Sequence, residues 1–289
     1  MLMLSGDWRI ERISMKTSVM INVFKGWIVA VCILAALPSM SENPGPEKRD
    51  KKHIVFLISE DPDNYEAHKT IPAFAEQLKA KYGFEFTVLL GEGPRNAFVF
   101  KNLEILDKAD LLVVFCRRVA LSPAQLGLIK KYLAAGKPVI GLRTANHAFS
   151  VREEAKPGHT AWWEFVPEIL GCENKGYGPV EPGTDVSVNP NNRGHAILSG
   201  VPATWHSEGN LYLVAPLLDP NAVVLLHGSA DGKTEPIAWT RETKNKSRIF
   251  YTSLGYPDDF KSEAFQTLLV NGIHWALKRK PIKSFSRQK

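Results

Sequence analysis

Hydrophobic and polar positions alternate in a strand and helix rhythm from residue 53 onward. Short runs such as HIVFLIS and DLLVVFC are apolar on both faces and predict buried strands, whereas the segments between them carry apolar residues at helical spacing. The predicted strands are 53–59, 84–90, 110–116 and 137–142, and the predicted helices are 70–82 and 122–136. Buried strands joined by helices indicate a doubly wound α/β fold, with a mainly parallel, flavodoxin-like sheet flanked by helices.

The pattern becomes less regular after residue 147. A short helix is predicted over 160–170, followed by a Gly, Pro and Asn-rich region that runs to about residue 192. The later apolar segments predict strands with hairpin character at 211–217, 222–228, 235–242 and 247–255, and a helix at 262–280. We therefore expect an antiparallel extension of the same sheet, within one domain that spans 53–280.

The N-terminal segment 1–41 is typical of a secretory signal peptide. Lys16 and Lys25 precede the apolar run WIVAVCILAAL, and Ser39 and Ser41 provide a small-x-small cleavage site. Residues 1–14 contain acidic groups that are unusual ahead of such a run, so Met15 is a possible start. The apolar run is shorter than the roughly 20 residues that span a bilayer. We expect an exported protein, periplasmic or secreted, with no stable membrane span after cleavage and a linker at 42–52; an uncleaved membrane anchor is the alternative.

Composition excludes several classes of protein. The chain has 289 residues, with 44% hydrophobic and 23% charged residues, which is ordinary globular composition. Its formal charge of +6 is weak and dispersed, so nucleic acid is not an expected partner. The basic tail 281–289 is expected to be solvated. Beyond the signal segment only Cys116 and Cys172 remain, and we expect two free, inert thiols, with a disulfide between them as the alternative. A homo-oligomer is left open.

Candidate chemistry lies where the predicted strands end, because open parallel sheets bind ligands at the carboxyl ends of their strands. The stretch GKPVIGLRTANHAF, residues 136–149, is typical of a strand, a sharp turn and a helix, the elbow that often carries a nucleophile. Here the turn carries Arg143 and Thr144, with His147 about one helical turn further on. Arg117 and Arg118 follow the neighbouring strand.

The chain resembles the ThuA-like (trehalose utilisation) family, a branch of the class I glutamine amidotransferase-like fold, from about residue 53 to 278. The matching pieces include DLLVVFCRR, WWEFVPEILG, GHAILSGVP and, most specifically, PIAWTRETKNKSRIFYTSLGYPDDFKSEAFQTLLVNGIHWAL. The resemblance implies carbohydrate utilisation and a small-molecule carbohydrate ligand.

The catalytic triad of class I amidotransferases is absent. Arg143 stands where their Cys lies, and Tyr256 and Asp258 stand where their His and Glu lie. A guanidinium cannot attack a carbonyl, and a tyrosine is a poor base near neutral pH. We therefore expect no glutamine amidotransferase activity. The sequence also departs from the ThuA-like pattern, which commonly has His at positions 143 and 256.

The predicted catalytic set is Arg143, His147, Tyr256 and Asp258. Arg143 at the elbow suits an oxygen that gains negative charge, and His147 could move a proton near pH 7. Tyr256 would supply a further proton donor and Asp258 an orienting carboxylate. The structural alternatives are that Arg143 pairs with Asp61 or Asp258 under the loops, and that His147 is a buried histidine that caps its helix.

The predicted substrate-binding residues surround this set; they are Arg117, Arg118, Thr144, Trp163, Glu208 and Tyr212. We expect only one of the two adjacent arginines to face the site. Trp162 and Trp163 point about 100° apart on a helix, so at most one of them can stack on a sugar. The histidines are scattered, with no ligand spacing and no identified cofactor, although a divalent metal held by residues distant in sequence stays open.

Two functional hypotheses follow. The first is an enzyme that acts on a sugar or keto-sugar at the strand ends by non-covalent acid and base chemistry, with Arg143, His147 and Tyr256 facing one pocket. The second is a non-catalytic carbohydrate-binding or partner-binding module that kept the fold and lost the triad.

Overall fold

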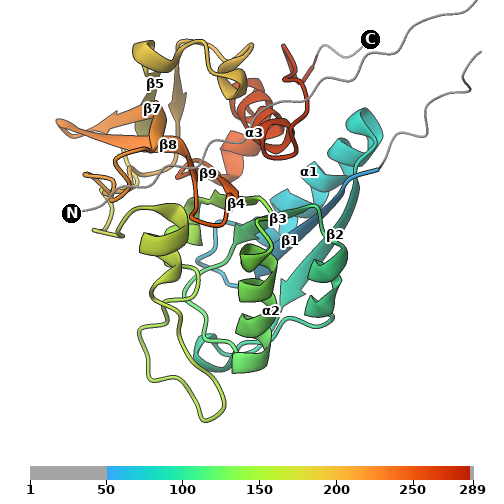
Figure 1. Cartoon of the computed structure of the whole chain (residues 1–289). Coiled ribbons are helices and arrows are strands. Elements are labelled where there is room, and N and C mark those ends of the chain that lie inside the picture. Colours follow the sequence, from blue (N-terminus) through green and yellow to red (C-terminus); the bar gives the residue numbers. More distant parts are fainter. Residues whose placement is uncertain (1–50, 287–289) are drawn as a thin grey trace, which may run out of the picture. The chain divides into compact units, whose positions relative to one another are not determined.

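The computed structural model describes residues 51–286, so the predicted signal peptide and nearly all of the predicted linker lie outside the described residues. One nine-stranded sheet organises the domain, in the order β2-β1-β3-β4-β9-β8-β7-β5-β6 (Figure 1). The strands are β1 His53–Ser59, β2 Glu85–Gly91, β3 Leu111–Phe115, β4 Val139–Leu142, β5 Thr184–Val188, β6 Thr204–Ser207, β7 Val223–Ala230, β8 Lys233–Glu242 and β9 Arg248–Thr252. The helices are α1 Ala67–Tyr82, α2 Pro123–Ala134 and α3 Glu263–Ala276.

The first five strands in this order are parallel, and the last four join them by antiparallel pairing. Alternate residues of β1 enter two separate cores: Phe56 packs with α1 and α3, and Leu57 packs with α2. Helices therefore cover both faces of the parallel part. The predicted doubly wound α/β class with an antiparallel extension is confirmed.

The ends of α2 follow the residues that the sequence places there. Ser122 accepts a hydrogen bond from the Gln125 backbone N–H, Pro123 occupies the first helical position, and Gly136 follows the last turn with a φ of 71°. A serine cap, an N-terminal proline and a C-terminal glycine satisfy or avoid the unpaired backbone groups at helix ends. This helix fixes the start of β4, and so the position of the elbow.

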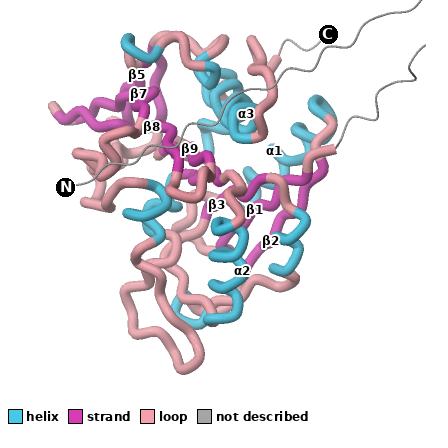
Figure 2. The backbone as a smooth tube through the Cα atoms, viewed as in Figure 1, coloured by secondary structure: helices cyan, strands magenta, loops and turns pink. Residues whose placement is uncertain are grey.

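Several predictions for the second half are wrong in detail. The predicted strand 211–217 is not a strand, because the backbone N–H groups of Val214 and Ala215 donate to the Glu235 carboxylate rather than to a neighbouring strand. The predicted helix 160–170 is reduced to one wide π-type turn, Phe165–Leu170, and α3 stops at Ala276. β5 and β6 were not predicted. Figure 2 shows loops as the main connection between β4 and β5.

The C-terminal segment is docked, which corrects the expectation of a solvated tail. Ile282 and Phe285 are buried, 8% and 3% exposed. The side-chain amide of Asn271 on α3 donates to the Ile282 carbonyl and accepts from the Ile282 N–H, and the Thr267 hydroxyl oxygen accepts from the Phe285 N–H. Although most of the neighbouring residues are basic or polar, Ile282 and Phe285 anchor this segment to the core.

Candidate functional site

The elbow after β4 is built as the sequence predicts, although its helical part is only a 3-10 turn over Arg143–His147. Arg143 has a φ of 42°, in the left-handed region that non-glycine residues rarely adopt. The Tyr251 hydroxyl donates to the Arg143 carbonyl over 2.8 Å, and the Thr144 hydroxyl donates to Asn64 Oδ1 over 2.7 Å. Buried hydrogen bonds thus hold a strained turn in place.

Arg143 does not face a ligand pocket. Its side chain is 1% exposed, and its guanidinium donates to the Ser253 carbonyl over 2.8 Å and to Asn210 Oδ1 over 2.5 Å. The rings of three tyrosines surround the charge at 4.0, 4.9 and 5.5 Å; they are Tyr65, Tyr212 and Tyr256. The expected shared pocket of Arg143, His147 and Tyr256 is therefore not present, and neither is the alternative ion pair of Arg143 with Asp61 or Asp258.

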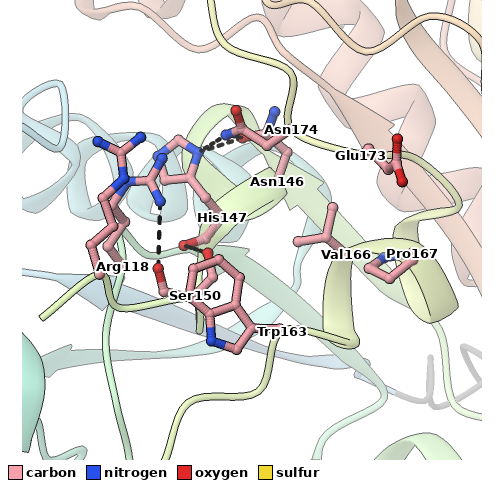
Figure 3. Close-up of a pocket in the computed structure, with 10 residues that line it drawn as sticks. Arg118, Asn146, His147, Ser150, Trp163, Val166, Pro167, Glu173 and Asn174 are labelled. Carbon is pink, nitrogen blue, oxygen red and sulfur yellow. Dashed lines mark hydrogen bonds between the residues drawn. The ribbon is translucent and has the colours of Figure 1, made fainter. Parts of the chain in front are cut away.

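His147 instead lines a cavity of about 260 Å³, which we call the His147 pocket (Figure 3). The 3-10 turn, the loop that follows it, the π-type turn and the start of the 171–183 loop all contribute to its walls. The lining residues are Arg118, Asn146, His147, Ser150, Arg152, Trp163, Val166, Pro167, Glu173 and Asn174.

One ring nitrogen of His147 is held and the other is not. Nδ1 lies 2.6 Å from Asn146 Oδ1 and 2.7 Å from Asn174 Nδ2, so it can donate to the first or accept from the second. Nε2 is buried with no hydrogen-bond partner, in a residue that is 2% exposed. Burial lowers the pKa of His147 well below its usual 6.5, and nearby arginines, first Arg118, lower it further. The ring is therefore neutral at pH 7.

Two more polar groups line the pocket, and the first lacks the partner that a buried group normally has. Asn146 is fully buried and its Nδ2 has no hydrogen-bond partner. Arg118 is 7% exposed, and its guanidinium donates to the Ser150 carbonyl over a long 3.4 Å. Arg152 adds a second, exposed guanidinium. The pocket thus offers hydrogen-bond donors and positive charge.

Arg117, Tyr256 and Asp258 line a different, wider cavity of about 690 Å³ near the same strand ends. Arg117 lies 3.3 Å from the Asp63 carboxylate, and Asp258 pairs with Lys261 at 2.6 Å. The ring of Tyr256 packs at 5.8 Å from that of Tyr65. The charged groups here are already paired. Of the two adjacent arginines, Arg118 lines the His147 pocket and Arg117 does not.

Of the other predicted binding residues, only Trp163 lines the His147 pocket. Trp163 lines the His147 pocket with 54% of its surface exposed, whereas Trp162 packs in the core, as expected for two adjacent residues. Thr144 and Tyr212 are buried under the elbow. Glu208 is exposed, and it lines neither of the two cavities described here.

Sequence reasoning missed Asn174 and Arg152 and gave Asn146 no role. Asn146 lies in the elbow stretch 136–149, where a polar amide side chain already indicated a hydrogen-bonding role. Asn174 comes from the irregular Gly and Asn-rich region, whose path the pattern could not give. Across residues 51–286, no group of three or more His, Cys, Asp or Glu side chains is placed to hold a metal ion. No helix in that range has the length and apolar character to cross a membrane.

Comparison with known proteins gives a family match and several similar solved structures. The model of the ThuA family, described as trehalose utilisation, matches residues 55–276. A ThuA-like protein from Bacteroides uniformis superposes with a TM-score of 0.59 at 18% identity, covering 82% of this chain and 96% of its own. One from Parabacteroides merdae gives 0.56 at 15%, covering 83% and 93%. No curated protein sequence matches the chain. At these identities the structural relatives establish the fold.

Proposed function

Because the chain belongs to the ThuA (trehalose utilisation) family, we propose that it acts on a keto-sugar by acid and base chemistry in the His147 pocket. One observation carries the proposal: a buried, neutral histidine presents an unpartnered Nε2 beside a buried arginine and an exposed tryptophan. The exposed Trp163 ring offers an apolar face for a sugar. The signal-like segment 1–41 supports an exported protein.

The chemistry is proton transfer next to a carbonyl. In the tautomer whose Nδ1–H donates to Asn146 Oδ1, Nε2 carries a lone pair and accepts a proton from the carbon beside the substrate carbonyl. The electrons of the broken C–H bond form a C=C bond, and the carbonyl pair moves onto its oxygen. Arg118 and the Asn146 amide are donors for this negative oxygen.

The imidazolium then returns its proton to the neighbouring carbon or to the oxygen, so no external reagent is consumed. A low histidine pKa suits this role in two ways. The base is unprotonated at neutral pH, and the imidazolium is a strong enough acid to give the proton back. Arg143 takes no direct part, because it is enclosed below the elbow. It holds the backbone that positions His147.

Exchange of deuterium from D₂O into the carbon next to the carbonyl, followed by NMR on a panel of keto-sugars, tests the proposal. We expect exchange with the natural chain and a loss of at least about a hundredfold in His147→Gln. His206→Gln is the matched control, because His206 is exposed on β6 and bonds only to Asp185. Equal exchange rates in the natural chain and His147→Gln would contradict the proposed base.

A non-catalytic carbohydrate-binding module is the second candidate. It is favoured by the enclosure of Arg143, since the elbow position at which class I amidotransferases carry their thiol is part of the core in this chain. Binding of keto-sugars without deuterium exchange in any variant would favour this candidate over the enzyme.

A further inference from the structure

The arginines near the strand ends fall into two groups by their partners. Arg95 pairs with Asp61 at 2.6 Å, and Arg117 lies 3.3 Å from Asp63. Neither Arg118 nor Arg152 forms an ion pair within residues 51–286. Arg118 instead contacts neutral groups, the Ser150 carbonyl and the Tyr177 side chain. The two arginines of the His147 pocket therefore have no carboxylate partner, whereas Arg117 in the neighbouring cavity pairs with Asp63.

Two guanidinium groups without an opposite charge repel each other. Arg118 is 7% exposed, and burial of a charge without an opposite charge weakens its hydration. Burial lowers the pKa of Arg118, and the charges of Arg152 and Arg117 lower it further, which reports mutual repulsion of the guanidinium groups. An anion between Arg118 and Arg152 would relieve both effects.

A buried neutral group of the pocket is also a donor. Asn146 Nδ2 has no hydrogen-bond partner and can only donate, so it too suits a negatively charged oxygen. The carboxylate of Glu173 at the pocket lies 3.8 Å from the Lys175 ammonium, so its charge is already balanced. A volume of about 260 Å³ is small for a ligand site and suits a single sugar ring.

We propose that the ligand of the His147 pocket is an anionic sugar whose negatively charged oxygen group, a carboxylate or a phosphate, binds between Arg118 and Arg152. The claim deepens the proposed function and rests on it for the sugar part of the ligand. It narrows the substrate class from keto-sugars in general to those that carry a charged group. The ring of such a sugar lies toward Trp163, and its carbonyl lies toward His147.

Calorimetric titration of the purified chain with glucose, glucuronate and glucose 6-phosphate tests the charge requirement. We expect one of the charged sugars to bind about tenfold to a hundredfold more tightly than glucose, the range expected for charge-assisted hydrogen bonds. Tighter binding of glucuronate identifies a carboxylate, and tighter binding of glucose 6-phosphate identifies a phosphate. Equal affinity for all three would overturn the inference.

Two variants locate the effect. Arg152→Gln changes an exposed side chain and should fold normally, and we expect it to lose about tenfold of the affinity for the charged sugar and none for glucose. Arg118→Gln should lose more, with circular dichroism checking its fold. Retention of full affinity by Arg152→Gln would overturn the assignment to this pocket. Deuterium exchange on an uncharged keto-sugar at the rate of a charged one would remove the charge requirement and leave the proposed function standing.

Discussion

Arg143 and His147 stand four residues apart on one elbow and face opposite environments. The guanidinium of Arg143 is enclosed by backbone and tyrosine groups, with donors to Ser253 and Asn210, whereas His147 Nε2 borders a cavity without a partner. In an amidotransferase-like elbow the first of these positions holds the nucleophile. Here that position is enclosed in the core, and His147, four residues later, lines the cavity in which we propose that the ligand binds.

Replacement of Arg143 by Gln should destabilise the fold. The shorter side chain leaves the Ser253 carbonyl and Asn210 Oδ1 buried without their donor, and it removes a cation from the tyrosine rings. We expect the free energy of unfolding, measured by urea titration, to fall by about 3 kcal/mol. Arg193→Gln is the control, because Arg193 is exposed, and its effect should stay within about 0.5 kcal/mol. Similar small changes in both variants would argue against a structural role.

The stability of the domain should fall as pH drops below about 6.5. Burial lowers the pKa of His147 in the folded chain, so the unfolded chain binds more protons once the pH passes below the ordinary value of 6.5. Burial lowers the pKa of His195 and of His274 in the same direction. Each histidine adds at most about 1.4 kcal/mol per pH unit to the slope of the unfolding free energy. Above about pH 6.5 the ring is neutral in both the folded and the unfolded chain, so its contribution no longer changes with pH.

Urea titrations of the natural chain at pH 7.5 and pH 5.5 measure this slope. His147→Gln removes one of the three groups and should make stability less dependent on pH, although its absolute stability differs. Arg193→Gln removes no histidine from the chain and should keep the natural dependence on pH. An unchanged slope in His147→Gln would mean that the buried ring takes up its proton in the folded chain.

Trp163→Ala should weaken ligand binding with little effect on folding. The side chain is 54% exposed at the pocket, so its removal costs the core almost nothing, but it removes the apolar face on which a sugar ring can pack. We expect up to about tenfold weaker binding of the charged sugar and a change in unfolding free energy within about 0.5 kcal/mol. Trp163→Phe keeps an aromatic face and should retain most of the affinity. Equal affinity in the Ala variant would place the sugar elsewhere.

The sequence predicted the parallel half of the sheet well and the site only in part. Strands such as β1 and β3 are short runs of apolar residues, a pattern that indicates burial on both faces of a sheet. His147 lines a pocket, as expected, but the direction expected for the Arg143 side chain was wrong. A direction at a left-handed residue depends on which buried groups surround it, and Ser253 and Asn210 come from more than 60 residues away. No periodicity encodes such contacts.

Removal of residues 281–289 should destabilise the domain more than its basic composition indicates. The deletion uncovers the core around α1 and α3, where Phe285 packs against Phe74, and it leaves the Asn271 side chain without its Ile282 partners. Loss of two buried apolar side chains predicts a fall of about 3 kcal/mol or more in unfolding free energy. A deletion of residues 287–289 alone is the control and should leave stability within about 0.5 kcal/mol, because it keeps both anchors. If both deletions behave alike in urea titration, Ile282 and Phe285 do not contribute to the core in solution.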